Sequence, residues 1–268
     1  MLTLLDGGMG TRLQEKGLGP SESPEDWSIT HPEIVRAIHR DYAKAGSNIV
    51  YTNTFGANRL KYHGAFALPD VIRASVELAK SSGAKVALDL GPTGKLLKPV
   101  GDLEFESAVE AFAETVRIGA EAGANLVAIE TMSDLYELKA AIVAAKENSA
   151  LPVYATVALQ PDGKLLTGGS VEAFAVLMES LDVTAYGFNC GLSPELMLPF
   201  VKRLKEFSTK PIIVKPNAGI PRVEGGKTVF DMKPTEFASC VKKLVEAGAS
   251  VVGGCCGTTD EFVRELAK

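Results

Sequence analysis

The chain has 268 residues, 46% of them hydrophobic, with a net charge of −5 and a sequence pI of about 5.4. The charges are spread without a basic run, which argues against nucleic acid or an anionic membrane as the main partner. No segment approaches the ~18 consecutive apolar residues of a membrane span, and no Pro/Ser-rich linker divides the chain. We therefore expect residues 1–268 to form one soluble, cytoplasmic domain with reduced cysteines.

Short apolar runs alternate with amphipathic stretches of helical length along the chain. The runs are apolar throughout, as expected for parallel strands covered by helices. They predict eight strands, at 3–8, 48–55, 85–92, 126–132, 152–159, 185–190, 211–219 and 250–256. The amphipathic stretches predict eight helices, at 31–46, 69–83, 104–123, 133–148, 170–181, 193–207, 233–248 and 258–268.

Local signals mark several helix ends. Ser133 before Asp134 and Ser193 before Pro194 are typical helix starts, and Gly46 is a typical helix end. Eight strand–helix units in about 250 residues predict a single-domain (β/α)8 TIM barrel. A doubly wound nucleotide-binding sheet is the alternative. However, the segment DGGMGT lacks the G-x-G-x-x-G spacing, and GPTGK is too short for a P-loop.

Polar residues follow the apolar runs where the predicted strands end. In a barrel enzyme these ends form the mouth that carries the chemistry, and polar side chains would be costly deeper inside. The residues at these ends are Asp6, Asn53, Thr54, Asp89, Glu130, Thr131, Asn189, Cys190, Lys215, Asn217, Cys255 and Cys256.

Three of the four cysteines, Cys190, Cys255 and Cys256, stand at the ends of the predicted sixth and eighth strands. These strands flank the seventh in a barrel, so the three thiols can face one another. Three thiolates suit zinc and leave a fourth position open for a substrate. Buried, unreactive thiols are the alternative, whereas a disulfide between adjacent cysteines is disfavoured by geometry. Cys240 lies in a helical pattern, and we expect it to pack in the core.

Five segments give the chain a specific resemblance, in order and over essentially its whole length: DGGMGT, TNTFGANRLK, GFNCG, KPNAG and GGCCGTT. Together they resemble the homocysteine S-methyltransferase family. Among its branches, NTFGANRLK, PNAG followed by GKTV, and GASVVGGCCGTT are most similar to the homocysteine-binding barrel of cobalamin-dependent methionine synthase.

The resemblance implies a role for each matching residue. Cys190, Cys255 and Cys256 would hold Zn²⁺, with the homocysteine sulfur in the open position as a thiolate. Asp6 and Glu130 would contact the amino acid, Glu130 being the expected partner of its ammonium group. The N–H groups of Gly7 and Gly8 would receive its carboxylate, and Asn217 would approach zinc when homocysteine is absent. Structural roles, as a cap, ion pair or turn residue, remain the alternatives for Asp6, Glu130 and Asn217.

The methyl donor is the main open question. The resemblance implies a methylated corrinoid such as methylcobalamin, carried by a separate domain or protein. A small donor (S-methylmethionine, S-adenosylmethionine or betaine) is the alternative, and selenohomocysteine or another thiol could replace homocysteine. A non-catalytic zinc-bound scaffold would require a fourth protein ligand. A metal-free aldolase-type lyase would require Lys215 as a Schiff-base residue. We expect His31, His39 and His63 to be solvated or capping residues.

Overall fold

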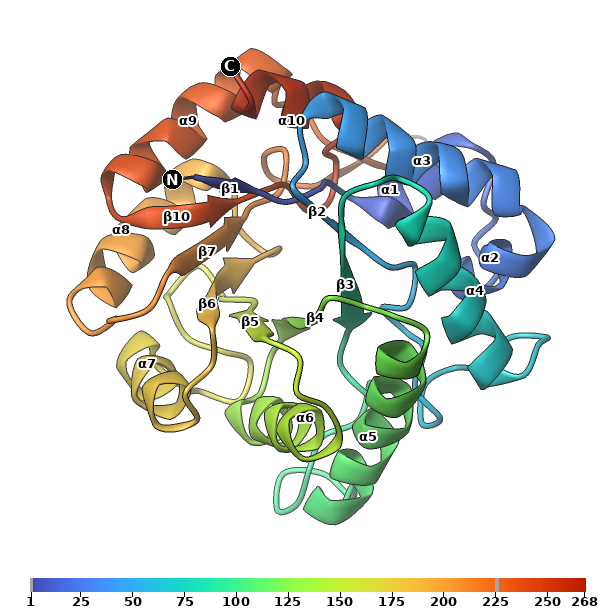
Figure 1. The fold of residues 1–268 in the computed structure, drawn as a ribbon. Coiled ribbons are helices and arrows are strands. Elements are labelled where there is room, and N and C mark those ends of the chain that lie inside the picture. The colour runs from blue at the N-terminus through green and yellow to red at the C-terminus, as the bar shows by residue number, and fades with distance from the viewer. Residues whose placement is uncertain (1, 225–226) are drawn as a thin grey trace.

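The computed structural model describes residues 2–224 and 227–268 as a barrel of parallel strands surrounded by helices (Figure 1). The eight barrel strands are hydrogen-bonded in the order β1-β10-β7-β6-β5-β4-β3-β2. This confirms the predicted (β/α)8 fold. The strands are β1 (Thr3–Leu4), β2 (Ile49–Tyr51), β3 (Lys85–Leu90), β4 (Leu126–Met132), β5 (Val153–Val157), β6 (Ala185–Asn189), β7 (Ile212–Lys215) and β10 (Ala249–Val252).

All eight predicted helices are present, with a few residues' difference at their ends. They are α3 (Pro32–Ala45), α4 (Leu68–Lys80), α5 (Phe105–Glu121), α6 (Leu135–Asn148), α7 (Val171–Ser180), α8 (Pro194–Lys205), α9 (Pro234–Glu246) and α10 (Asp260–Leu266). Ser193 caps α8 through the Leu196 N–H, as predicted. The cap of α6 is Asp134 rather than Ser133, because the Asp134 carboxylate accepts the N–H groups of Tyr136 and Glu137.

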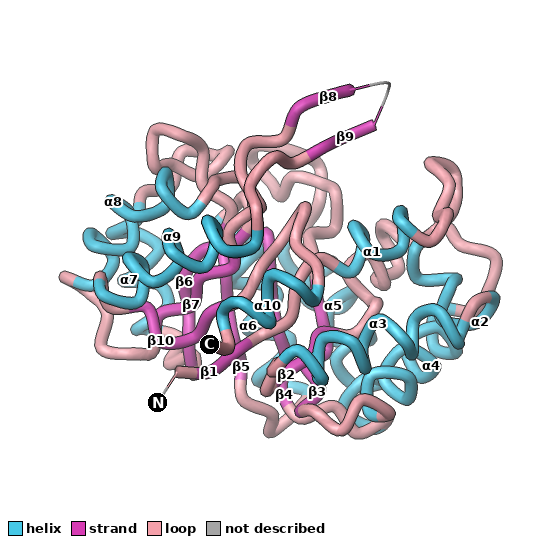
Figure 2. The backbone as a smooth tube through the Cα atoms, turned by 90° about the horizontal axis from the view of Figure 1, so that it is seen from above, coloured by secondary structure: helices cyan, strands magenta, loops and turns pink. Residues whose placement is uncertain are grey.

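Two parts of the fold were not predicted from the sequence. Between β1 and α3 the chain forms α1 (Met9–Glu15), a 3₁₀ turn η1 (Pro24–Asp26) and α2 (Trp27–Thr30), all too short for a periodic signal. After β7, strands β8 (Arg222–Glu224) and β9 (Lys227–Val229) pair as an antiparallel ribbon. Figure 2 shows this ribbon projecting from the side of the barrel where the strands end.

Two apolar cores hold the layers together. The larger core lies between the strands and the helices, and a smaller one lines the barrel interior; it includes Leu5, Tyr51, Ala87, Ala128 and Ile213. Since strand side chains alternate in direction, residues two positions beyond an inward-facing residue face inward too. Asp89, Glu130 and Lys215 therefore lie on the inner side of their strands, at the carboxyl ends.

The barrel is closed between β1 and β2 partly by side chains. The Asn48 N–H donates to the Leu4 carbonyl at 2.7 Å, and the Asn48 side-chain oxygen accepts the Leu4 N–H at 2.7 Å. Two residues after Leu4, toward the mouth, the Asp6 side chain continues this contact: the Tyr51 N–H donates to Asp6 Oδ2 at 2.6 Å. We call these contacts the β1–β2 seam.

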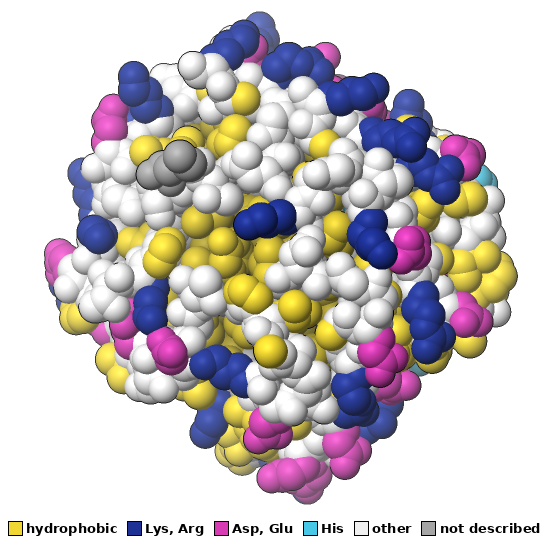
Figure 3. Space-filling view, in the orientation of Figure 1, with side chains coloured by type: hydrophobic (Ala, Val, Ile, Leu, Met, Phe, Trp, Pro, Cys, Tyr) yellow, Lys and Arg dark blue, Asp and Glu magenta, His cyan; other side chains and the backbone are white. Residues whose placement is uncertain are grey.

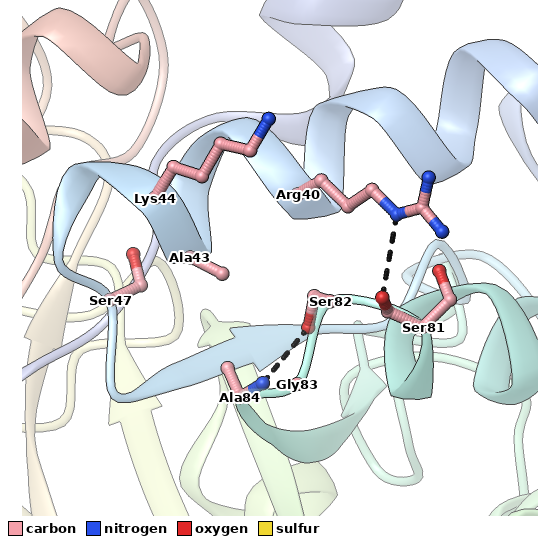
Figure 4. A pocket seen from close by; sticks show the side chains of 8 residues that line it. All are labelled: Arg40, Ala43, Lys44, Ser47, Ser81, Ser82, Gly83 and Ala84. Carbon is pink, nitrogen blue, oxygen red and sulfur yellow. Dashed lines mark hydrogen bonds between the residues drawn. The ribbon is translucent and has the colours of Figure 1, made fainter.

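The opposite face of the barrel, where the strands begin, is shown in Figure 3, with apolar side chains gathered over its middle. A shallow cavity of about 440 Å³ lies near its edge between the ends of α3 and α4 (Figure 4). Its polar groups make local contacts: Arg40 Nε donates to the Ser81 carbonyl, and the Ala84 N–H donates to Ser82 Oγ. Among the described residues, no helix is long and apolar enough to cross a bilayer.

Candidate functional site

A buried cluster of charged side chains lies inside the barrel mouth, centred on Lys215 at the end of β7. Lys215 Nζ lies 3.1 Å from Glu130 Oε2 and 3.4 Å from Asp6 Oδ1, and 3.5 Å from the centre of the Tyr51 ring. Lys215 is 3% exposed and Asp6 is 1% exposed. The structure therefore brings Asp6 and Glu130, predicted from two distant strands, to one ammonium group of the protein.

Burial controls the protonation of this cluster. Burial raises the pKa of Asp6 to about 6, although Lys215 and the Tyr51 N–H act in the opposite direction. Burial also raises the pKa of Asp89 well above its usual range, and the charge of Glu130 adds to this. Burial alone would lower the pKa of Lys215, but Glu130 and Asp6 hold it well above its usual value. A raised pKa favours the protonated ammonium form of Lys215, whereas a Schiff-base lysine must be neutral to attack, so this does not support the aldolase-type alternative.

Asp89 is a further buried carboxyl at this level. It is 5% exposed, and its Oδ1 has no hydrogen-bond partner. Its backbone is fixed by the segment that follows β2, since the Asp89 N–H donates to Thr52 Oγ1 and its carbonyl accepts from Thr54 Oγ1. Two carboxyl groups therefore pair with Lys215, and the buried Asp89 adds an acceptor oxygen without a partner.

The three predicted cysteines form one cluster beside these charges. The Sγ atoms of Cys190, Cys255 and Cys256 all lie within 4.8 Å of one another, and those of Cys190 and Cys256 are 3.8 Å apart. Within the described residues, this is the one group of three or more His, Cys, Asp or Glu side chains arranged to hold a metal ion. The strand order β10-β7-β6 explains it, because β7 separates the two cysteine-bearing strands.

Tight turns aim the thiols. Cys190 has a left-handed backbone with φ of 55°, which is unfavourable for a residue with a Cβ. It is held by its own N–H, which donates to the Lys215 carbonyl at 3.0 Å, and by its carbonyl, which accepts the Leu192 N–H at 2.6 Å. On the other side, the Cys255 carbonyl accepts Thr258 Oγ1 at 2.7 Å. Both ends of the cluster are therefore fixed by the backbone.

The donor set fits zinc. Tetrahedral zinc–thiolate bonds of about 2.3 Å place pairs of sulfurs about 3.8 Å apart, as observed for Cys190 and Cys256. Hydrogen bonds from the Cys255 and Cys256 thiols lower the pKa of Cys190 to about 3, and donating them raises the pKa of Cys256 to about 12. Cys190 is thus the thiolate of the cluster, and the Cys255 and Cys256 thiols donate to it.

Asn217 and the two glycines have internal partners. Asn217 is 3% exposed, and its Oδ1 accepts the Cys256 N–H at 3.1 Å, so it lies beside the cluster and fixes the turn that carries it. The Gly8 N–H donates to Thr258, at 3.1 Å to Oγ1 and 3.3 Å to the carbonyl. Gly8 would have to release this bond to receive a carboxylate. Gly7 packs against Tyr42 and Thr258 so closely that a Cβ would lie within 3.0 Å of both.

Two lesser predictions need correction. Cys240 is only partly buried, and its Sγ lies 2.8 Å from Glu195 Oε1 between α9 and α8. His39 is fully buried in α3 with both ring nitrogens unpartnered, and burial lowers its pKa to about 4. It is thus a neutral core residue, because α3 turns this face toward the barrel. His31 stacks on Trp27 with ring centres 4.2 Å apart.

Sequence reasoning placed Asn189 and Thr131 at strand ends without assigning them roles. Asn189 is fully buried, and its amide links Thr131 to the cysteine cluster. In the sequence, the position of Asn189 directly before Cys190 is the one feature that points to a contact between this amide and the cysteines.

These features define a (β/α)8 barrel in which three thiols that could hold a metal ion lie beside a buried cluster of charged side chains. The homocysteine S-methyltransferase family model matches residues 3–268. The chain belongs to this family.

Two relatives agree with that assignment. The chain is 32% identical over 287 residues to methionine synthase of Mycobacterium leprae (strain TN) and 32% identical over 286 residues to that of Mycobacterium tuberculosis (strain ATCC 25618 / H37Rv). Each match covers 98% of this chain and 24% of the relative. The chain thus spans about a quarter of the length of these relatives.

The fold is also that of the Escherichia coli homocysteine methyltransferase MmuM. The metallated form has a TM-score of 0.83 at 23% identity, and covers 99% of this chain and 95% of that one. The apo form has a TM-score of 0.77 at 24% identity.

Proposed function

We propose that residues 1–268 form a zinc-dependent barrel that transfers a methyl group to the thiol of homocysteine and so forms methionine. The convergence of Cys190, Cys255 and Cys256 within 4.8 Å carries this proposal, because three cysteine sulfurs at one point are a donor set that suits zinc and leave a fourth position for a substrate. The three thiolates would hold zinc, which when bound supplies a Lewis acid that keeps the thiol of homocysteine deprotonated.

The chain's own residues would bind and orient the amino acid. Glu130 is the more open of the two paired carboxylates, with 12% of its side chain exposed against 2% for Asp6. We therefore assign the substrate ammonium group to Glu130, with Asp6 supporting it through Lys215. Gly7, and Gly8 once its N–H is released from Thr258, would bind the substrate carboxylate. Asn217 would hold the Cys256 turn and approach the metal before homocysteine binds.

A methylated corrinoid, such as methylcobalamin, carried by a separate domain or protein, is our proposed donor. It is supported by the likeness to methionine synthases over 98% of this chain but only 24% of their length, which leaves most of each relative outside the barrel. A small donor such as S-methylmethionine is the second candidate, because the solved homocysteine methyltransferase that shares this fold consists almost wholly of the matched barrel, with 95% of its chain covered. A non-catalytic scaffold is less well supported. A closed zinc site needs four protein ligands, whereas the cluster among the described residues has three.

Metal content tests the cysteine assignment. We expect about one zinc per chain, and replacing Cys190, Cys255 or Cys256 by Ser should weaken zinc binding strongly. Cys240→Ser is the matched control and should leave zinc unchanged. Stoichiometric zinc of unchanged affinity in the triple variant would show that other residues bind the metal.

Substrate binding and donor use are tested separately. Glu130→Gln should weaken homocysteine binding by about 1–3 kcal/mol, as expected for the loss of a charge-assisted hydrogen bond, with zinc content unchanged. Glu172 of α7, which is partly exposed and pairs with Arg203 away from the barrel mouth, provides the control, Glu172→Gln. Slow demethylation of free methylcobalamin that accelerates when the donor is tethered supports the corrinoid. Rapid, saturable turnover of S-methylmethionine or betaine alone would assign a small donor instead.

A further inference from the structure

Asn189, the last residue of β6, makes an unusual set of contacts for a core amide. It is fully buried. Its Oδ1 accepts the Thr131 N–H at 2.7 Å and Thr156 Oγ1 at 2.8 Å. Its Nδ2 donates to Thr131 Oγ1 at 2.7 Å and lies 3.9 Å from Cys255 Sγ, within range of an N–H···S hydrogen bond.

The residue that Asn189 holds most tightly is strained. Thr131 has φ of 60°, a left-handed conformation that is especially unfavourable for a β-branched side chain. The pairing of β4 with β5 shifts register between Ile129 and Met132, so the strain coincides with a bulge. Such strain persists only where surrounding contacts enforce it. Here the Asn189 amide holds Thr131 by two hydrogen bonds: it accepts the backbone N–H and donates to the side-chain hydroxyl.

Glu130 immediately precedes Thr131 and faces the barrel interior by alternation from Ala128. A bulge bends its strand and re-aims the side chains beside it, so the bulge at Thr131 bears on where the Glu130 carboxylate ends, 3.1 Å from Lys215 Nζ. The same amide reaches the sulfur of Cys255 on β10. One buried side chain thus contacts both the strand that aims the carboxylate and the cluster of thiols.

We propose that Asn189 is a positioning residue that couples the amino-acid-binding carboxylate of Glu130 to the metal-binding thiolate of Cys255. This inference rests on the proposed function, because it assigns homocysteine to Glu130 and zinc to the cysteines. The Thr131 arm sets the orientation of Glu130. The Cys255 arm donates a hydrogen bond to sulfur, and such outer contacts orient metal ligands. Asn189 itself touches neither the substrate nor the metal.

Thr131→Val alters one arm, and Asn189→Asp alters both. Thr131→Val keeps the β-branch and the N–H but removes the Oγ1 acceptor, so it weakens the hold on the bulge without touching Cys255. Asn189→Asp keeps an acceptor for the Thr131 N–H but removes the Nδ2 donor to both Thr131 Oγ1 and Cys255 Sγ, so a loss of zinc affinity absent from Thr131→Val measures the Cys255 arm. Thr156→Val is the matched control, since it removes the third contact of the same amide and reaches neither arm.

The ligands measured are homocysteine and 4-mercaptobutanoate, a thiol acid that lacks the ammonium group. Thr131→Val should weaken homocysteine binding about tenfold, leave 4-mercaptobutanoate binding unchanged and leave zinc affinity unchanged. Its effect should disappear in the Glu130→Gln background, because the carboxylate it aims is then already replaced. Asn189→Asp should lower zinc affinity about 10- to 100-fold and shift the sulfur-to-cobalt absorption of the cobalt-substituted protein. Thr156→Val should do neither.

Two outcomes would overturn the proposal. One is an equal loss of both ligands in Thr131→Val, together with full additivity with Glu130→Gln. The other is an Asn189→Asp protein with unchanged zinc affinity and cobalt spectrum. If Asn189→Asp fails to fold, the Thr131→Val measurements decide the question. Failure of the proposed function looks different, because the unaltered protein would then bind neither zinc nor homocysteine.

Discussion

Lys215 is the strongest test of the buried charge cluster, because its removal leaves two carboxyls without their cation. We predict that Lys215→Met lowers the free energy of unfolding of the metal-free protein by about 3 kcal/mol at pH 8. Breaking a buried ion pair by removing one partner costs about 3–5 kcal/mol. We choose the lower end because the Tyr51 N–H still bonds to Asp6 Oδ2 and because Asp6 can take up a proton instead.

The pH dependence carries the sharper part of this prediction. The pKa of Asp6 in the folded protein is about 6, against a usual 3.8, which corresponds to about 3 kcal/mol of unfavourable ionisation. A carboxyl with a raised folded pKa destabilises the fold as pH rises from its unfolded to its folded value. Without Lys215 the folded pKa rises further. The difference in the free energy of unfolding between the unaltered protein and Lys215→Met should therefore be small at pH 5 and largest at pH 8.

Urea denaturation at pH 5, 6.5 and 8, with chelator and reductant present, measures this difference. Lys210→Met is the matched control, because Lys210 pairs with Asp182 at the surface, and its removal should change stability little at any pH. A Lys215→Met loss that is equally large at pH 5 and pH 8 would refute the electrostatic account and point to packing alone.

Three further predictions concern single positions. Asp89→Asn should raise the free energy of unfolding by about 1–2 kcal/mol at pH 8 and have no effect near pH 4, because it removes a buried charge with a raised pKa; lower stability at pH 8 in urea titrations would contradict this. Gly187→Ala should destabilise by about 3 kcal/mol, because its Cβ would lie 2.0 Å from the Ile213 carbonyl oxygen. By contrast, Gly10→Ala, exposed in α1 with open space around it, should stabilise by up to about 1 kcal/mol; thermal unfolding of the pair tests both, and equal shifts would exclude the steric reason.

The positions of the strands and the convergence of the cysteines could be predicted from the sequence for a common reason. Apolar runs of strand length indicate buried strands, so the strand positions can be predicted. A barrel then fixes which strands are neighbours, so Cys190 after β6 and Cys255 after β10 lie on either side of β7. The bulge at Thr131 could not be predicted, because its left-handed backbone depends on an amide 58 residues away. The pairing of Lys215 with Glu130 was missed likewise, since strand-end residues show no sign of the partner that the barrel interior selects.

The β1–β2 seam restricts which side chains position 6 can tolerate. Asp6 joins β1 to β2 through Oδ2 and pairs with Lys215 through Oδ1. One residue therefore contributes both to the closure of the barrel and to the buried charge cluster. Asp6→Ala would remove both the hydrogen bond from the Tyr51 N–H and the negative charge beside Lys215. Asparagine can keep an oxygen opposite the Tyr51 N–H while removing the charge, so it would separate the two contributions. A chain that altered its specificity at this position would therefore have few substitutions available that leave the barrel closed.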